Sequence, residues 1–350
     1  VYGRVEKGLN VMLAGAGGYI LANAEGSLQS VVADDHCLPA AHLATEDGDV
    51  LRDWLESGSG HQARISSVGS RRNSAVADIL ADSSSRGPAA PPVEDVLKPN
   101  LMAPGSDILG AFAKDGDDAN QYAYLSGTSM ASPHAAGAGA LLRAVNPDWT
   151  PSMISSALET TATNHLARDA DGNPATPFEA GAGRPVLGQA VEAGLYFEVT
   201  EQDFRQANPG LGGAPGALNL PSLAESECRE VCSFTRTVTS MTFGNATWSA
   251  SAAGFPEGVT ITVTPSEFTL GNGDSQLLTI EVDLSGANVI GQWVYGKVML
   301  DAVGLPAQGL TTAVYATGGT LPDEWTISSN RDSGNNFFFL NELTRLPDLT

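Results

Sequence analysis

The spacing of apolar residues changes along this 350-residue chain. Apolar residues recur at helical spacing from Val5 to Met12, and a cluster of glycines separates them from the short apolar run Tyr19–Ala22. A second helical pattern follows Thr45 and stops at Gly58. Helical spacing predicts amphipathic helices, and a short apolar run bounded by glycine predicts a buried strand. The first segment is therefore predicted to be an α/β piece, with a capped helix starting at Thr45.

A long helix rich in alanine is predicted in the middle of the chain, from about Ser129 to Val145. The breaker sequence 146–148 ends it, and a further helix is predicted to open at Pro151, because proline is favoured in the first turn of a helix. The stretch 208–216 is rich in glycine and proline, which is typical of a linker between domains.

Beyond this linker the hydrophobic period becomes two. Segments 234–239, 259–264 and 277–282 alternate apolar and polar residues, as half-buried antiparallel strands do. Several such strands within about 100 residues predict a β-sandwich of the immunoglobulin or fibronectin type. The last segment, 318–350, begins with further strand-like residues.

Charge narrows the range of partners. The chain has 40 Asp and Glu against 18 Lys and Arg, which gives a formal net charge of -22. Such a surface repels phosphate groups, so nucleic acid and anionic membranes are not expected partners. No apolar run is long enough to span a bilayer. The sequence does not indicate an oligomeric state.

The three cysteines are Cys37, Cys228 and Cys232. No second cysteine pair or spaced histidines accompany the close pair, so no metal site or cofactor is predicted, although a structural calcium is left open. A short disulfide between Cys228 and Cys232 is expected in an oxidising compartment, with two reduced thiols as the alternative. The preceding residues 224–227 are predicted to have little regular structure, which would ease the geometry of this bond.

The sharpest chemical signal is the string Ser-Gly-Thr-Ser-Met-Ala-Ser-Pro-His at residues 126–134. A serine entering a long helix lies where free backbone N–H groups and the helix dipole favour negative charge. Acyl transfer needs such a place, because the attacked carbonyl becomes an oxyanion. Gly127 would let a substrate backbone approach closely. On spacing alone, an ordinary serine N-cap explains the pattern at least as well.

The string resembles the nucleophile signature of subtilases, the subtilisin-like serine proteases. Two earlier segments agree in order: 83–88 is similar to the family's serine-rich loop, and 98–105 to its Lys-Pro-Asp segment, with Asn100 in place of the usual acid. Residues 146–151 and 156–162 resemble the helices that follow the nucleophile.

The resemblance extends to the flanks and implies a domain order. Residues 1–67 look like the C-terminal part of a protease-associated α/β domain, and 68–195 like the C-terminal part of the α/β, parallel-sheet catalytic domain. Residues 196–317 are similar to a linker and an all-β, fibronectin-III-like sandwich, and 318–350 would begin a further region.

The resemblance implies a secreted serine endopeptidase that acts on proteins or peptides. Ser129 would be the nucleophile, and Gly127 and Thr128 would lie at the oxyanion and substrate-binding positions. The family's aspartate, histidine and oxyanion asparagine motifs do not occur here. We expect them upstream of Val1, and we expect these 350 residues to be inactive alone. His134 follows Ser129 by five residues on one helix, where side chains do not face each other. The alternative is a non-catalytic secreted binding protein derived from a subtilase.

The sequence contains two further motifs that are weaker signals. Residues 169–173 resemble the start of an EF-hand loop, but Pro174 stands where glycine is needed, so a solvated loop is predicted. Asn245-Ala246-Thr247 is a sequon for N-linked glycosylation, which matters only in a eukaryotic secretory host.

Overall fold

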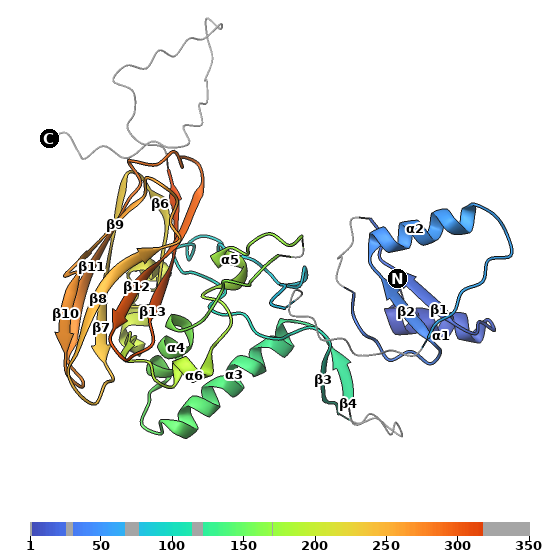
Figure 1. Cartoon of the computed structure of the whole chain (residues 1–350), viewed down its shortest axis with the longest axis horizontal. Coiled ribbons are helices and arrows are strands. Elements are labelled where there is room, and N and C mark those ends of the chain that lie inside the picture. The colour runs from blue at the N-terminus through green and yellow to red at the C-terminus, as the bar shows by residue number, and fades with distance from the viewer. Residues whose placement is uncertain (1, 26–30, 67–76, 114–121, 170, 318–350) are drawn as a thin grey trace, which may run out of the picture. The chain divides into compact units, whose positions relative to one another are not determined.

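The computed structural model describes residues 2–25, 31–66, 77–113, 122–169 and 171–317 (Figure 1). The contacts divide the chain into two compact units, Val1–Pro88 with Lys98–Ala193 and Ala89–Leu97 with Gly194–Thr350. The short segment 89–97 thus belongs to the second unit, although it interrupts the sequence of the first. The predicted boundary between residues 67 and 68 and the strand-like residues 318–350 lie outside the described residues.

The N-terminal part of the first unit has the predicted α/β character. Its elements are α1 (Arg4–Leu13), β1 (Tyr19–Ala22), β2 (Ala40–Leu43) and α2 (Thr45–Glu56). Strands β1 and β2 pair in parallel, and both helices contact β1 (Figure 1). The capping prediction is wrong in one detail, because Ala44 rather than Thr45 is the N-cap of α2 and no side chain caps this helix.

The rest of the first unit combines a strand pair with helices. Strands β3 (Ile108–Ala111) and β4 (Tyr122–Leu125) pair antiparallel. Helices α3 (Thr128–Val145) and α4 (Pro151–Thr160) contact each other, and the short helices α5 and α6 span Pro177–Ala180 and Leu187–Ala190. Helix α4 begins as predicted. Pro151 takes its first position, and the Thr150 hydroxyl accepts a hydrogen bond from the N–H of Met153.

The second unit contains a β-sandwich of two sheets. One sheet has the order β10-β8-β12-β13-β6, and the other β5-β7-β11-β9. Their strands are β5 (Leu195–Tyr196), β6 (Ser222–Cys228), β7 (Val231–Ser240), β8 (Ala246–Ala253), β9 (Thr260–Thr264), β10 (Glu267–Leu270), β11 (Ser275–Asp283), β12 (Trp293–Ala302) and β13 (Gln308–Ala316). The core between the sheets includes Trp248, Leu278 and Leu300, all fully buried. The three predicted alternating segments are strands β7, β9 and β11.

The connection into the sandwich is more regular than predicted. The segment expected to be a linker, 208–216, contains two 3-10 turns, Pro209–Leu211 and the start of Pro215–Ala217, and it follows helix α7 (Glu201–Gln206). Residues 224–227, expected to lack regular structure, belong to β6. This strand forms because β13 pairs with it in parallel, with Thr311 opposite Ser222.

Candidate functional site

Ser129 is the second residue of helix α3, and its side chain is exposed. Gly127 is the N-cap of this helix, so the ordinary N-cap role is wrong for Ser129. The first backbone N–H groups of a helix have no acceptor within the helix, and they lie at the positive end of its dipole. The hydroxyl of Ser129 therefore lies among groups that favour negative charge.

Gly105 brings the segment 98–105 against the start of α3. The Gly127 N–H donates a 2.7 Å hydrogen bond to the Gly105 carbonyl. A Cβ on Gly105 would lie 2.8 Å from the Gly127 carbonyl oxygen and 3.2 Å from the Cβ of Ala131. Only a residue without a side chain allows this approach, so two of the motifs singled out in the sequence are in direct contact.

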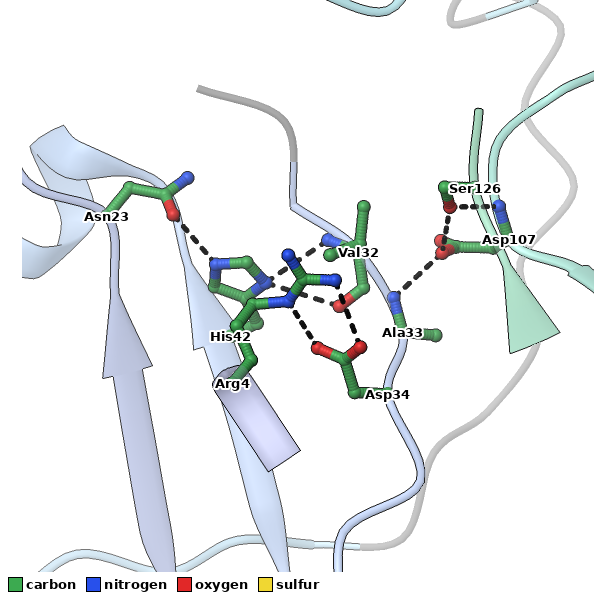
Figure 2. Close-up of polar contacts among 8 residues, drawn as sticks. All are labelled: Arg4, Asn23, Val32, Ala33, Asp34, His42, Asp107 and Ser126. Carbon is green, nitrogen blue, oxygen red and sulfur yellow. Dashed lines mark hydrogen bonds and ion pairs between the residues drawn. The ribbon is translucent and has the colours of Figure 1, made fainter. Parts of the chain in front are cut away.

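Asp107 and Ser126 fix the chain just before the helix. The Ser126 hydroxyl accepts a 2.8 Å hydrogen bond from the Asp107 N–H and donates to Asp107 Oδ1 at 3.2 Å (Figure 2). The same carboxylate accepts from the Ala33 N–H at 2.7 Å. Asp107 has a φ of 51°, a left-handed conformation that aspartate adopts more readily than most residues. Sequence reasoning missed Asp107, and its place two residues after Gly105 is the only local signal.

The three ordered motifs of the sequence meet at one pocket of about 570 Å³. It is lined, among others, by Ser83, Met102, Pro104, Thr128, Ser132 and Arg184. Ser83 comes from the serine-rich segment, Met102 and Pro104 from the segment 98–105, and Thr128 from the start of α3. Gly127 also lines the pocket, whereas Ser129 lies outside its lining.

A buried carboxylate supports the segment 98–105 from helix α4. Glu159 accepts hydrogen bonds from Asn100 Nδ2 at 2.9 Å and from the Ser155 hydroxyl at 2.8 Å. Lys98 Nζ donates to Asn100 Oδ1 at 2.6 Å. Burial raises the pKa of Glu159, and the hydrogen bonds from Asn100 and Ser155 and the charge of Lys98 oppose this shift only in part. Sequence reasoning singled out Asn100 but missed its partner, which is a glutamate on the buried side of α4.

A second carboxylate ties the serine-rich segment to helix α5. Arg86 Nε lies 2.8 Å from Glu179 Oε1, and Glu179 Oε2 accepts from the Thr176 N–H at 2.8 Å. Burial alone would raise the pKa of Glu179, but the hydrogen bonds from Thr176 and the contact with Arg86 outweigh it and lower the pKa.

Each of the five histidines is engaged away from Ser129. His134 Nδ1 lies 2.7 Å from the carbonyl of Met130, one turn back on α3. His42 Nε2 lies 2.8 Å from Asn23 Oδ1, and its other ring nitrogen lies beside the backbone of Val32 (Figure 2). The remaining three contact neighbouring side chains: His36 with Tyr19, His61 with Trp54 and His165 with Thr163. In the part of the chain that the structure describes, Ser129 therefore has no base beside it.

The cysteines lie in the second unit and in the N-terminal part of the first. Cys228, at the end of β6, and Cys232, in β7, form a disulfide, while Cys37 is an exposed free thiol. Over the described ranges, no group of three or more His, Cys, Asp or Glu side chains could hold a metal ion. None of the helices in those ranges is both long and apolar enough to cross a bilayer.

Comparison with known proteins divides the chain into two matched regions. Residues 30–183 match the model of the subtilase family, and residues 217–306 match that of a fibronectin type-III domain. Subtilisin-like protease SBT1.7 of Arabidopsis thaliana is 32% identical over 338 residues, covering 84% of this chain and 44% of the relative. Subtilisin-like protease SBT1.6 of the same plant is 33% identical, covering 75% of this chain and 39% of the relative. The chain thus spans less than half the length of these relatives.

Proposed function

This chain belongs to the subtilase family through residues 30–183, and on that premise we propose that the complete protein is a serine endopeptidase with Ser129 as its nucleophile. One observation carries the proposal. Thr128 and Ser129 are the exposed first residues of α3, Gly127 is its half-buried N-cap, and all three lie inside the region that matches the family.

The chemistry would follow the serine-protease pattern. The Ser129 oxygen attacks the carbonyl carbon of a peptide bond while a histidine takes the hydroxyl proton, and an aspartate orients that histidine. The same histidine then gives the proton to the leaving amine, and water hydrolyses the acyl-enzyme. We propose that the histidine and the aspartate come from residues outside this sequence, because all five histidines here are engaged elsewhere.

The start of α3 would stabilise the oxyanion. The backbone N–H of Ser129 and the helix dipole act on the negative charge that develops on the attacked oxygen. Gly127 leaves room for an extended substrate backbone, and Thr128 borders the pocket beside it. A separate asparagine side chain, also outside this sequence, would complete the oxyanion hole.

The proposed substrates are proteins or peptides, and the proposed location is extracellular. A disulfide between β6 and β7 fits an oxidising compartment. The net charge of -22 disfavours phosphate-rich partners such as nucleic acid.

The nucleophile is tested in two proteins. These 350 residues, incubated with a fluorophosphonate probe, should stay unlabelled by intact mass, because a serine without a base is a very weak nucleophile. The complete protein should be labelled at Ser129 and should hydrolyse peptides at neutral to alkaline pH, where its histidine is neutral. Stoichiometric labelling of the 350-residue chain would mean that a base has been overlooked.

Ser132 provides the comparison, because it is an exposed serine one turn further along α3 that lines the pocket but is not the proposed nucleophile. In the complete protein, Ser129→Ala should lower turnover by several orders of magnitude with little change in thermal stability, and Ser132→Ala should change turnover much less. Near-wild-type turnover of Ser129→Ala would overturn the assignment. It would favour the alternative, a secreted binding protein without catalysis, if the unaltered protein were also inactive.

A further inference from the structure

The connection from β7 in one sheet to β8 in the other carries the sequence Phe243-Gly244-Asn245-Ala246-Thr247, whose last two residues begin β8. Two hydrogen bonds hold this connection. The Thr242 hydroxyl donates to the Gly244 carbonyl at 2.6 Å, and the Ser240 N–H donates at 2.9 Å to the carbonyl of Asp274, just before β11. Asn245 is thus presented on a supported connection between the two sheets of the sandwich.

The side chains at the start of β8 separate into buried and exposed sets. Trp248 is fully buried, while Asn245, Thr247 and Ser249 are exposed, as alternation along a strand requires. Among the described residues, none hydrogen-bonds to the side-chain amide of Asn245. A Cβ at position 271 would lie 2.9 Å from Asn245 Oδ1, so glycine at that position leaves space beside the amide.

Phe243 is the most exposed large aromatic side chain in the described part of the chain, with a relative exposure of 105%. It stands two residues before Asn245 in the same connection. A single exposed apolar residue needs no special explanation. Beside an accessible sequon, however, the face of an aromatic ring offers a surface on which the apolar face of a sugar can pack.

We propose that Asn245 is a site of N-linked glycosylation and that the first sugar of the glycan packs on the ring of Phe243. Asn245-Ala246-Thr247 is the only Asn-X-Ser/Thr sequence, with X other than proline, in the 350 residues. This inference rests on the proposed extracellular location and requires a eukaryotic secretory pathway, but it does not depend on catalysis by Ser129.

The modification is a glycosyl transfer from a lipid-linked oligosaccharide pyrophosphate. A bond forms between Asn245 Nδ2 and the anomeric carbon of the first sugar, and the bond from that carbon to the pyrophosphate oxygen breaks. The lipid pyrophosphate leaves with the electron pair, and the amide nitrogen loses one proton to a base of the transferase. No oxidation or reduction takes place.

The site is tested by secreting the 350-residue chain from a yeast host behind an added leader peptide, so that the protein's own route of secretion does not affect the result. Intact mass before and after peptide N-glycosidase F should show one glycan. Peptide mapping should find aspartate at position 245 after the enzyme has acted. Asn245→Gln and Thr247→Ala should abolish the glycan, and Thr247→Ser should retain it.

Asn272 provides the matched control, because it is an exposed asparagine in the neighbouring turn between β10 and β11 and lies outside any sequon. Asn272→Gln should leave the glycan in place. A secreted wild-type chain without a glycan, from a host that glycosylates a reference protein, would overturn the proposed site whatever the outcome of the Ser129 tests.

The contact between the first sugar and Phe243 is tested separately, by thermal unfolding. Removing the glycan should lower the melting temperature of the wild-type chain by about 4 °C, and that of Phe243→Ala by clearly less, because the ring contact is already absent from the variant. Equal shifts in the two proteins would show that the sugar does not pack on Phe243.

Discussion

The side-chain amide of Asn100 donates a 2.9 Å hydrogen bond to the carboxylate of Glu159, which is only 5% exposed on helix α4. In the segment that 98–105 resembles, an acid stands at the position of Asn100. In this protein the acid of the cluster comes from the helix, and Lys98 reaches it through the asparagine. The carboxyl group of this cluster is therefore supplied by α4 rather than by the loop.

Glu159→Gln should flatten the dependence of stability on pH. Because burial raises the pKa of Glu159, the folded state holds its proton more tightly than the unfolded state does. The corresponding stability is fully present below the unfolded pKa and is lost as pH rises through the folded pKa. Urea unfolding measured from about pH 4 to 8 should show this loss in the wild type and less of it in the variant. The exposed residue Glu192 provides the control, and Glu192→Gln should keep the wild-type slope.

The contribution of Glu179 to stability should depend on pH in the opposite direction, and Glu179→Gln tests this. The hydrogen bonds from Thr176 and the contact with Arg86 lower the pKa of Glu179, so its contribution is present above the unfolded pKa and is lost as pH falls through the folded pKa. The variant should be less stable than the wild type at pH 7, and this difference should shrink in acid. Urea unfolding at both ends of the range measures it. A constant difference across the range would contradict the prediction.

Gly105→Ala should destabilise the first unit by about 1–3 kcal/mol, because the new methyl group would overlap the Gly127 carbonyl oxygen. Gly110→Ala is the matched control, since a Cβ there meets nothing within 4 Å, and its effect should stay within about 0.5 kcal/mol. Thermal unfolding of the two variants decides the matter. Equal melting temperatures would contradict the prediction, because they would show that the start of α3 shifts to accommodate the methyl group at little cost in stability.

Replacing both Cys228 and Cys232 by serine should cost about 2 kcal/mol, the value expected from chain entropy for a loop this short. Cys37→Ser should change stability little, because Cys37 is exposed and unpaired. Non-reducing peptide mapping of the secreted protein should first find Cys228 linked to Cys232. Free thiols at both positions would remove the basis of the prediction.

The spacing of apolar residues is sufficient to predict the elements that present one apolar face. Helices α1 and α4 and strands β7 and β11 lie where the spacing of apolar residues predicts them. Strand β13 shows no alternation because it is buried along nearly its whole length, so a search for period two passes over it.

The contacts of the candidate site were harder to predict than its location. The string 126–134 located the start of α3 to within one residue. Glu159 lies 59 residues from Asn100, and Asp107 contacts Ala33 from 74 residues away. No local pattern reports such pairs, because their stability depends on how distant segments pack rather than on the residues beside them.

The chain passes between its two compact units three times, because residues 89–97 belong with the sandwich. The Ser226 N–H donates a 2.8 Å hydrogen bond to Asp95 Oδ1 and so holds this segment to β6. A sandwich that began at Gly194 would lack that acceptor and the buried side chain of Leu97. Transfer of residues 194–350 alone to another protein would leave part of this unit behind. The fibronectin-like unit can be moved intact only together with residues 89–97, which lie within the sequence of its neighbour.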